Sequence, residues 1–212
     1  MTDLALVCGA GGALGTALVE AFQARGDVVI GVDRKGAARD GVRMEKADLT
    51  DAASVEALWE RIETPRWVVN AAGAFRGGRV DDTDPETLAF LLDVNFKTAF
   101  LSCRAASRRL ERGGAIVNVS ARAAVTGGAG AAVYAASKAA VVRLTEVLAD
   151  EVAGRGIRAN AVLPLLIDTP ANRTALPPER LENAVPPDRV ASVCAFLCSE
   201  AADAVTGASL PV

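Results

Sequence analysis

Tyr134 and Lys138 are the residues of this sequence whose types and spacing best suit chemistry. They lie four positions apart in a segment of helical period, so the phenol and the ammonium should share one face, one turn apart. A free tyrosine has a pKa near 10, and a nearby positive charge favours the phenolate. Lowering that pKa by about 3 units requires roughly 4 kcal/mol of differential stabilisation. The pair predicts acid–base catalysis, with the phenol exchanging a proton with a substrate oxygen or nitrogen.

The chain contains no histidine, and Tyr134 is its only tyrosine. The absence of histidine excludes Ser-His-Asp and Cys-His triads and every histidine-bearing metal site. Cys194 and Cys198 lie one helical turn apart, but no third ligand is near them in sequence, so two core thiols and no metal site are expected. By itself, a tyrosine and a lysine at this spacing could belong to any amphipathic helix, so the case depends on the rest of the chain.

A glycine-rich turn follows the first apolar run of the chain and precedes helical sequence. Glycines let the backbone approach a pyrophosphate closely, and the start of a helix supplies free N–H groups and a positive dipole end. A tight turn or another nucleotide site would also explain such a run, but its position after the first strand favours a dinucleotide site. The residues expected to hold the cofactor here are Gly9, Gly11, Gly12, Ala13, Leu14 and Gly15.

Asp33 lies eighteen positions after Gly15, at the end of the second predicted strand. A carboxylate at this position can accept hydrogen bonds from the adenosine ribose hydroxyls, and it would repel a 2′-phosphate. Asp33 therefore favours NAD(H) over NADP(H). Arg34 and Lys35 could neutralise a 2′-phosphate, which keeps NADP(H) as the alternative. Asp33 could also be a solvated carboxylate at the end of a strand, with no role in binding.

Apolar strands alternate with stretches of helical period, and these elements must position the groups above. Such alternation predicts right-handed βαβ units, a central parallel sheet covered on both faces and one α/β domain over residues 1–212. The proline-rich stretch 164–187 should be irregular, either a substrate lid or a plain surface connection. The expected strands are Leu4–Cys8, Val28–Val32, Val42–Lys46, Trp67–Asn70, Ala115–Ser120 and Arg158–Leu163, and the clearest helices are Pro85–Leu110, Val133–Ala153 and Asp188–Ser199.

Together these motifs resemble the short-chain dehydrogenase/reductase family over essentially the full chain. The resemblance includes the glycine turn, Asp48-Leu49, Asn70-Ala71-Ala72-Gly73, Asn95, the run from Ile116 to Ser120, and Tyr134 with Lys138. It implies a three-layer, doubly wound Rossmann fold and an NAD(P)-dependent oxidoreductase. It also implies that Lys138 holds the nicotinamide ribose and that Asn95 supports a proton relay. The further cofactor contacts it implies are Asp48 and Leu49 at the adenine, Asn70, Ala71, Ala72 and Gly73 along the cleft, and Pro164, Ile167 and Thr169 at the carboxamide.

Two departures from the family pattern concern the site. Ala13 stands where a middle glycine is usual, which narrows the turn slightly. The family's catalytic serine lies thirteen positions before the tyrosine, and here that position is Ala121. Ser120 is one place earlier, where a side chain at a strand end points to the other face. Either a local bulge brings Ser120 round to polarise the substrate, or the role is missing.

A partial resemblance to dihydropteridine reductase accompanies the missing serine. It lies in the end of the glycine turn, in Ala161–Pro164, in Asp168–Pro170 and in Asn172-Arg173, whereas Asn95 matches only the broader family. A quinonoid dihydropterin is an activated acceptor that needs less help from a serine than a ketone does. Reduction of such a pterin is therefore an alternative to our main expectation, hydride transfer between NAD(H) and a small carbonyl or alcohol.

Two other classes of function are alternatives to an oxidoreductase. A non-catalytic NAD-binding sensor is favoured by Ala121 and opposed by Tyr134, Lys138 and Asn95. A methyltransferase would leave Tyr134 and Lys138 unexplained.

Charge and composition limit the partners. The balance of 23 basic and 26 acidic residues argues against nucleic-acid or anionic-membrane binding. No leader or membrane span is expected at the N-terminus, and four scattered cysteines are expected to be reduced, so we expect a cytoplasmic protein. The helices at 85–110 and 133–153 match those that pair subunits in the family, which implies a homodimer or a homotetramer.

Overall fold

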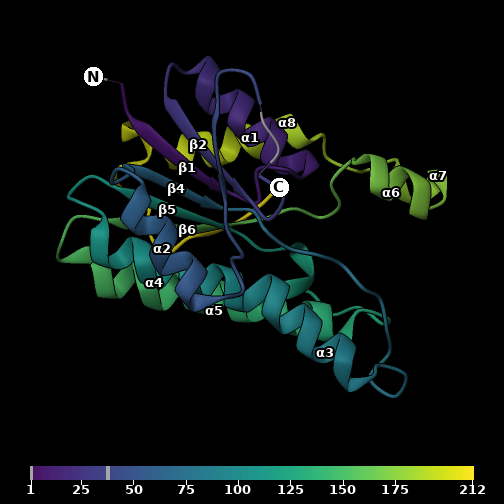
Figure 1. The fold of residues 1–212 in the computed structure, drawn as a ribbon. Coiled ribbons are helices and arrows are strands. Elements are labelled where there is room, and N and C mark those ends of the chain that lie inside the picture. The colour runs from purple at the N-terminus through teal and green to yellow at the C-terminus, as the bar shows by residue number, and fades with distance from the viewer. Residues whose placement is uncertain (1, 37–38) are drawn as a thin grey trace.

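The computed structural model describes residues 2–36 and 39–212 and contains one seven-stranded sheet (Figure 1). All neighbouring strands are parallel, in the order β3-β2-β1-β4-β5-β6-β7. The order reverses between β1 and β4, and ligands of such sheets bind at this switch point, beyond the carboxyl ends of the strands. The strands are β1 (Leu4–Cys8), β2 (Val28–Asp33), β3 (Arg43–Lys46), β4 (Trp67–Asn70), β5 (Ala115–Val119), β6 (Arg158–Leu163) and β7 (Ser209–Pro211).

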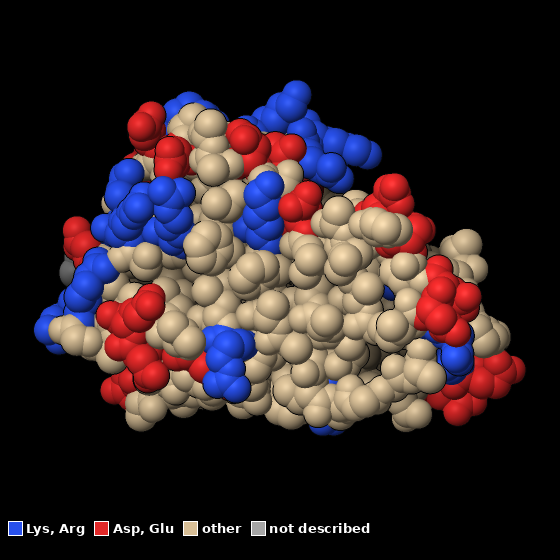
Figure 2. Space-filling model, turned by 90° about the horizontal axis from the view of Figure 1, so that it is seen from below, with Lys and Arg blue, Asp and Glu red and all other residues tan. Residues whose placement is uncertain are grey.

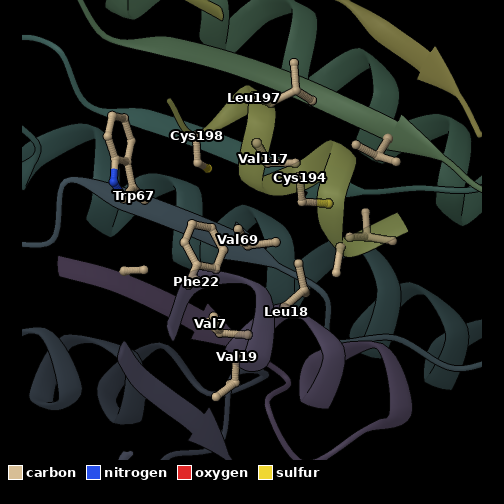
Figure 3. Close-up of a cluster of buried hydrophobic side chains, with 14 of the residues drawn as sticks. Val7, Leu18, Val19, Phe22, Trp67, Val69, Val117, Cys194, Leu197 and Cys198 are labelled. Carbon is tan, nitrogen blue, oxygen red and sulfur yellow. The ribbon is translucent and has the colours of Figure 1, made fainter. Parts of the chain in front are cut away.

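Helices cover both faces of the sheet, which confirms the predicted three-layer Rossmann architecture (Figure 1). On one face lie α1 (Ala13–Ala24) and α8 (Pro187–Leu197), and on the other lie α2 (Ala52–Arg61), α4 (Thr98–Arg109) and α5 (Ala132–Ala153). Successive strand residues enter opposite cores, because side chains alternate along a strand. Val7 and Val69 pack with Phe22, Cys194 and their neighbours beneath α1 and α8 (Figure 3), whereas Leu6 and Val68 pack on the opposite face.

The predicted strands differ from the observed ones by one residue at a few ends, and β7 was missed. β2 extends to Asp33, β3 begins at Arg43, and β5 ends at Val119. β7 has three residues and includes Pro211, and a proline removes one ladder donor. So short an edge strand carries no periodic pattern, and only its pairing with β6 identifies it.

In the structure, the helix predicted over residues 85–110 is divided into three consecutive helical segments. These are α3 (Pro85–Leu91), a π-helical segment η1 (Leu92–Lys97) and α4. Asp84 caps the start, since its carboxylate accepts a hydrogen bond from the Thr87 N–H at 2.6 Å. The apolar stripe runs through all three segments, so a wider turn in the middle is invisible to a search for helical period. Asn95 lies inside that wider turn.

Two connections depart from the expectation. Parallel strands β2 and β3 are joined by residues 34–42 alone, and no helix occurs among the described residues of this link, which is too short for a helical crossover. Residues 164–187 are not irregular throughout, because they include α6 (Pro170–Ala175) and α7 (Pro178–Leu181). Both short helices project away from the body (Figure 1), and a bridge between Ile167 and Val185 joins the base of the projection.

No helix in the described ranges combines the length and the apolar character that crossing a membrane requires.

Candidate active site

The first turns of α5 carry Tyr134 and Lys138 to the carboxyl end of the sheet. Lys138 is 5% exposed, and its Nζ donates a hydrogen bond to the Val119 carbonyl at 2.9 Å. The Tyr134 ring meets the ring of Phe75 edge to face, with 4.9 Å between centroids. Phe75 itself is 62% exposed, so the phenol lies at the border between the packed interior and open solvent.

Burial shifts the pKa of both groups. It raises the pKa of Tyr134, because the phenolate loses hydration, and it lowers the pKa of Lys138 to about 8, because the ammonium does. The predicted stabilisation of the phenolate by the ammonium, helped by the cofactor's positive charge, stays a prediction. A stabilised phenolate would need a further positive charge, of the kind that an oxidised nicotinamide carries.

Asn95 connects the loop after β4 to α5, the helix that carries Tyr134 and Lys138. Its Oδ1 accepts a hydrogen bond from the Ala74 N–H at 2.9 Å, and its Nδ2 donates to the Ala74 carbonyl at 3.0 Å. Nδ2 also donates to Ser137 Oγ at 3.1 Å, and Ser137 in turn donates to the Tyr134 carbonyl at 2.8 Å. The π turn thus supplies a buried amide that fixes the backbone around Tyr134.

Gly73 leaves the space in which Asn95 and Lys138 meet. A Cβ built at Gly73 would lie 2.8 Å from Asn95 Oδ1 and 3.1 Å from Lys138 Nζ. Any side chain there would displace one of these two groups. The structure therefore brings Gly73 and Asn95, which are distant in the sequence, to the helix that carries Tyr134 and Lys138.

Ser120 points away from the site. Its Oγ donates to the Lys138 carbonyl at 2.8 Å, and its N–H donates to the Val162 carbonyl at 2.9 Å, which continues the β5–β6 ladder. The β5–β6 register has no bulge. The Ser120 hydroxyl is therefore not turned toward the substrate by a local bulge. The residue at position 121, Ala121, has only a methyl group. The polarising role expected for Ser120 has no support in this geometry.

The glycine turn fits a pyrophosphate. Gly9 has φ +89°, and a Cβ there would lie 2.7 Å from the Ala72 backbone N, so the turn packs directly against the loop after β4. α1 follows Gly12 with no side-chain cap and no acidic residue in its first turn, which leaves its N–H groups and dipole available to an anion. Ala13 is exposed at the first position of α1, where its methyl group does not crowd the turn.

Asp33 lies beside this turn, as the spacing predicted. A Cβ at Gly11 would be 2.8 Å from the Asp33 carboxylate, and the carboxylate accepts a hydrogen bond from the Lys35 N–H at 3.0 Å. Thr50 lowers the pKa of Asp48 through two hydrogen bonds, with a smaller effect from Arg34. The neighbouring Leu49 is buried in the core, so its side chain is not free to contact an adenine ring.

Other residues that were predicted to contact the cofactor form hydrogen bonds within the protein. Asn70 Nδ2 donates to Asn118 Oδ1 at 2.7 Å, inside the sheet. Thr169 Oγ1 caps α6 by accepting from the Asn172 N–H at 3.1 Å, and Asn172 also donates to the Ile167 carbonyl. The Pro164 carbonyl accepts from a backbone N–H of the loop after β5. Ala71 and Ala72 lie in the loop against the glycine turn.

Phe75 contacts Tyr134 and Arg122 adjoins Ala121, and neither residue was predicted to matter. Phe75 lies two positions after Gly73, where an exposed aromatic residue next to a cofactor motif was the available signal. Arg122 directly follows Ala121 and opens a single 3-10 turn, η2 (Arg122–Ala124). An arginine beside the missing serine was a usable signal too, but nothing in the sequence shows whether it has an ion-pair partner.

Comparisons with known proteins agree with this geometry. A family model described as Enoyl-(Acyl carrier protein) reductase matches residues 9–212. The (3R)-3-hydroxyacyl-CoA dehydrogenase of Rattus norvegicus is 34% identical over 245 residues, covering 99% of this chain and 94% of the relative. A variant of a Serratia marcescens short-chain dehydrogenase/reductase superposes with TM-score 0.90 at 28% identity, covering 99% of this chain and 96% of its own. A blue fluorescent protein from a metagenomic library, solved with NADPH, superposes with TM-score 0.89 at 27% identity and the same coverage of both chains.

Proposed function

The chain belongs to the short-chain dehydrogenase/reductase family of oxidoreductases, and from this premise we propose that it transfers a hydride between NAD(H) and a small carbonyl or alcohol substrate. The observation that carries the proposal is the meeting of Tyr134 and Lys138 with Asn95 beside the glycine turn. When bound, the nicotinamide supplies or accepts the hydride. Tyr134 exchanges the proton with the substrate oxygen, and Lys138 supplies positive charge and hydrogen-bond donors at the nicotinamide ribose. Asn95 holds the backbone around the tyrosine.

The proposed cofactor is NAD(H). The Asp33 carboxylate beside Gly11 supports this choice, since it occupies the space that a 2′-phosphate would approach. NADP(H) remains the competitor because a metagenomic neighbour was solved with NADPH. Calorimetric titration with both reduced cofactors tests the choice. Tighter binding of NADH, reversed or erased by Asp33→Ala, would support it, whereas a preference for NADPH would reject it.

Reduction of a quinonoid dihydropterin is the second candidate function. Ser120 is turned toward α5 and Ala121 has no hydroxyl, so the site has no serine to polarise an unactivated ketone. An activated acceptor needs less of that polarisation. The same observation favours a sensor that binds NADH without turnover, and only an assay separates the three.

Residues 164–187 are proposed to act as the substrate lid of a single catalytic domain. The projection of α6 and α7 from the end of β6 supports this role (Figure 1). The four thiols are free and buried, which supports a cytoplasmic location.

We also propose a homodimer or homotetramer. Figure 2 shows a broad uncharged area on the face below the sheet, with charges gathered toward its margins. Helices of this layer expose large apolar side chains, which a second copy would cover. These side chains are Leu88, Leu92, Phe100 and Val147.

The test is NADH oxidation by the purified protein with quinonoid dihydropterin, small ketones and diketones as acceptors. Tyr134→Phe runs in parallel. Turnover that disappears in the variant would establish the enzyme, and the preferred acceptor would choose between the carbonyl and pterin functions. NADH binding without turnover on any acceptor would favour the sensor and reject our proposal.

A further inference from the structure

Arg122 lies in the loop that follows the carboxyl end of β5, the edge at which parallel sheets of this kind bind their ligands. Its backbone N–H donates to the Pro164 carbonyl at 2.9 Å, so it joins the carboxyl ends of β5 and β6. The turn η2 packs against α5, the helix that carries the tyrosine and the lysine, and Ala124 of this turn contacts a cluster with Val142 and Leu163. Arg122 also directly follows Ala121, the position at which the family carries its serine.

The guanidinium of Arg122 lacks the partners that such a group normally has. Its Nε is buried and has no hydrogen-bond partner, and no carboxylate in the described ranges forms an ion pair with it. Every other arginine of the described chain that is not exposed has an acceptor. Those arginines are Arg39, Arg66, Arg104 and Arg158.

A half-buried cation without an acceptor is costly, because desolvation is not offset by hydrogen bonds. Such a cost is commonly retained where a ligand supplies the missing acceptor. Lys138 also lies at this end of the sheet, and its Nζ meets a carbonyl and no carboxylate in the part of the chain that the structure describes. The site therefore offers unneutralised positive charge to a substrate.

We propose that Arg122 is a specificity-determining residue that binds an anionic group of the substrate, so that the substrate is a small carbonyl or alcohol carrying a carboxylate or a phosphate. A guanidinium matches either oxyanion through two parallel hydrogen bonds. This inference rests on the proposed hydride transfer. It adds to that function the charge of the substrate and the residue that recognises it.

Two matched substrate pairs test the proposal and separate the two oxyanions. One pair is 4-oxopentanoate and its methyl ester, and the other is dihydroxyacetone phosphate and dihydroxyacetone. The wild type should prefer the charged member of one pair in kcat/KM, and Arg122→Gln should reduce that preference about 10- to 100-fold, the range expected for a charge-assisted hydrogen bond. Arg122→Lys should retain part of the preference. Arg108→Gln, at an exposed position at the end of α4, is the control that should retain all of it.

The proposal is overturned if the wild type prefers neither charged member, or if Arg122→Gln keeps the preference unchanged. A calorimetric measurement separates this failure from failure of the proposed function. If neither pair is turned over although NADH binds, the protein–NADH complex is titrated with pentanoate, propyl phosphate and pentanamide. Binding of one anion that is lost in Arg122→Gln would support the assignment, and equal or absent binding of all three would reject it.

Discussion

The two walls of the site differ in how firmly they are held. The wall formed by β4, β5 and α5 is buried and hydrogen-bonded, as Asn95, Ser120 and Lys138 show. The opposite wall, from Pro164 through α6 and α7, projects from the body and is largely exposed. Proton transfer requires fixed geometry, whereas substrate recognition tolerates variation. We therefore expect the proposed acid–base chemistry to depend on the rigid wall, and the choice of substrate to depend on the proposed lid and on the loop that carries Arg122.

The largest effect that this comparison predicts is at Tyr134. Tyr134→Phe should lower kcat by about 10²–10⁴-fold, the range for loss of a general acid–base group. NADH binding measured by calorimetry should change little, because the ring still packs on Phe75. A variant that retains more than a tenth of wild-type turnover would show that the proton comes from another group.

Lys138→Met tests how much the buried ammonium of Lys138 lowers the free energy of unfolding. The pKa of Lys138 falls from 10.5 in the unfolded chain to about 8 in the fold, so the charged form is disfavoured by folding. Below pH 8 the lysine is charged in both states and destabilises the fold by about 3 kcal/mol, and above pH 10.5 it is neutral in both and the penalty vanishes. The stability of the wild type should therefore rise relative to Lys138→Met between pH 8 and 10.5.

Urea unfolding at several pH values measures this difference. Lys46→Met is the matched control, because it removes a lysine that is exposed on β3. A constant difference between wild type and Lys138→Met over the same range would show that the buried ammonium is not destabilising.

Gly73→Ala should destabilise the fold and impair turnover together. Its Cβ would overlap Asn95 Oδ1 at 2.8 Å, and overpacking of a tight site costs about 1–3 kcal/mol. The melting temperature and kcat should both fall relative to the wild type. Gly154→Ala is the control, because no atom lies within 4 Å of a Cβ at that position. Equal effects of the two substitutions would mean that the crowding around Gly73 does not matter.

The smallest effect is expected in the lid. Thr169→Ala removes the cap of α6, and Asp51→Ala removes the equivalent cap of α2, each worth about 1 kcal/mol to its helix. The loss at α2 should lower the global melting temperature because α2 packs on the sheet. The loss at α6 should appear only as faster amide exchange of residues 170–175, because a projecting element opens locally. Similar global shifts would show that the lid unfolds with the body.

Much of the fold and some of the site could be predicted from the sequence. Strand runs such as Leu4–Cys8 and Arg158–Leu163 were correct because a buried parallel strand is a short apolar run with few alternatives. The π turn at Asn95 and the strand β7 were not found, because neither leaves a periodic signal. The structural contacts of Leu49, Asn70 and Thr169 were not found either, since their side chains pack or hydrogen-bond with residues that are distant in the sequence or belong to a helix cap.

The sequence by itself determined the chemistry available and the order of its parts: the glycine turn, Asp33, and one tyrosine four positions before a lysine in a chain without histidine. These signals are local, because a turn or a helix face depends on residues a few positions apart. Only the tertiary structure decided that Ser120 faces α5, that burial shifts the pKa of Tyr134 and Lys138 in opposite directions, and that the Arg122 Nε is buried without an acceptor among the described residues. Burial and pairing depend on residues distant in the chain, and no short pattern in the sequence contains them.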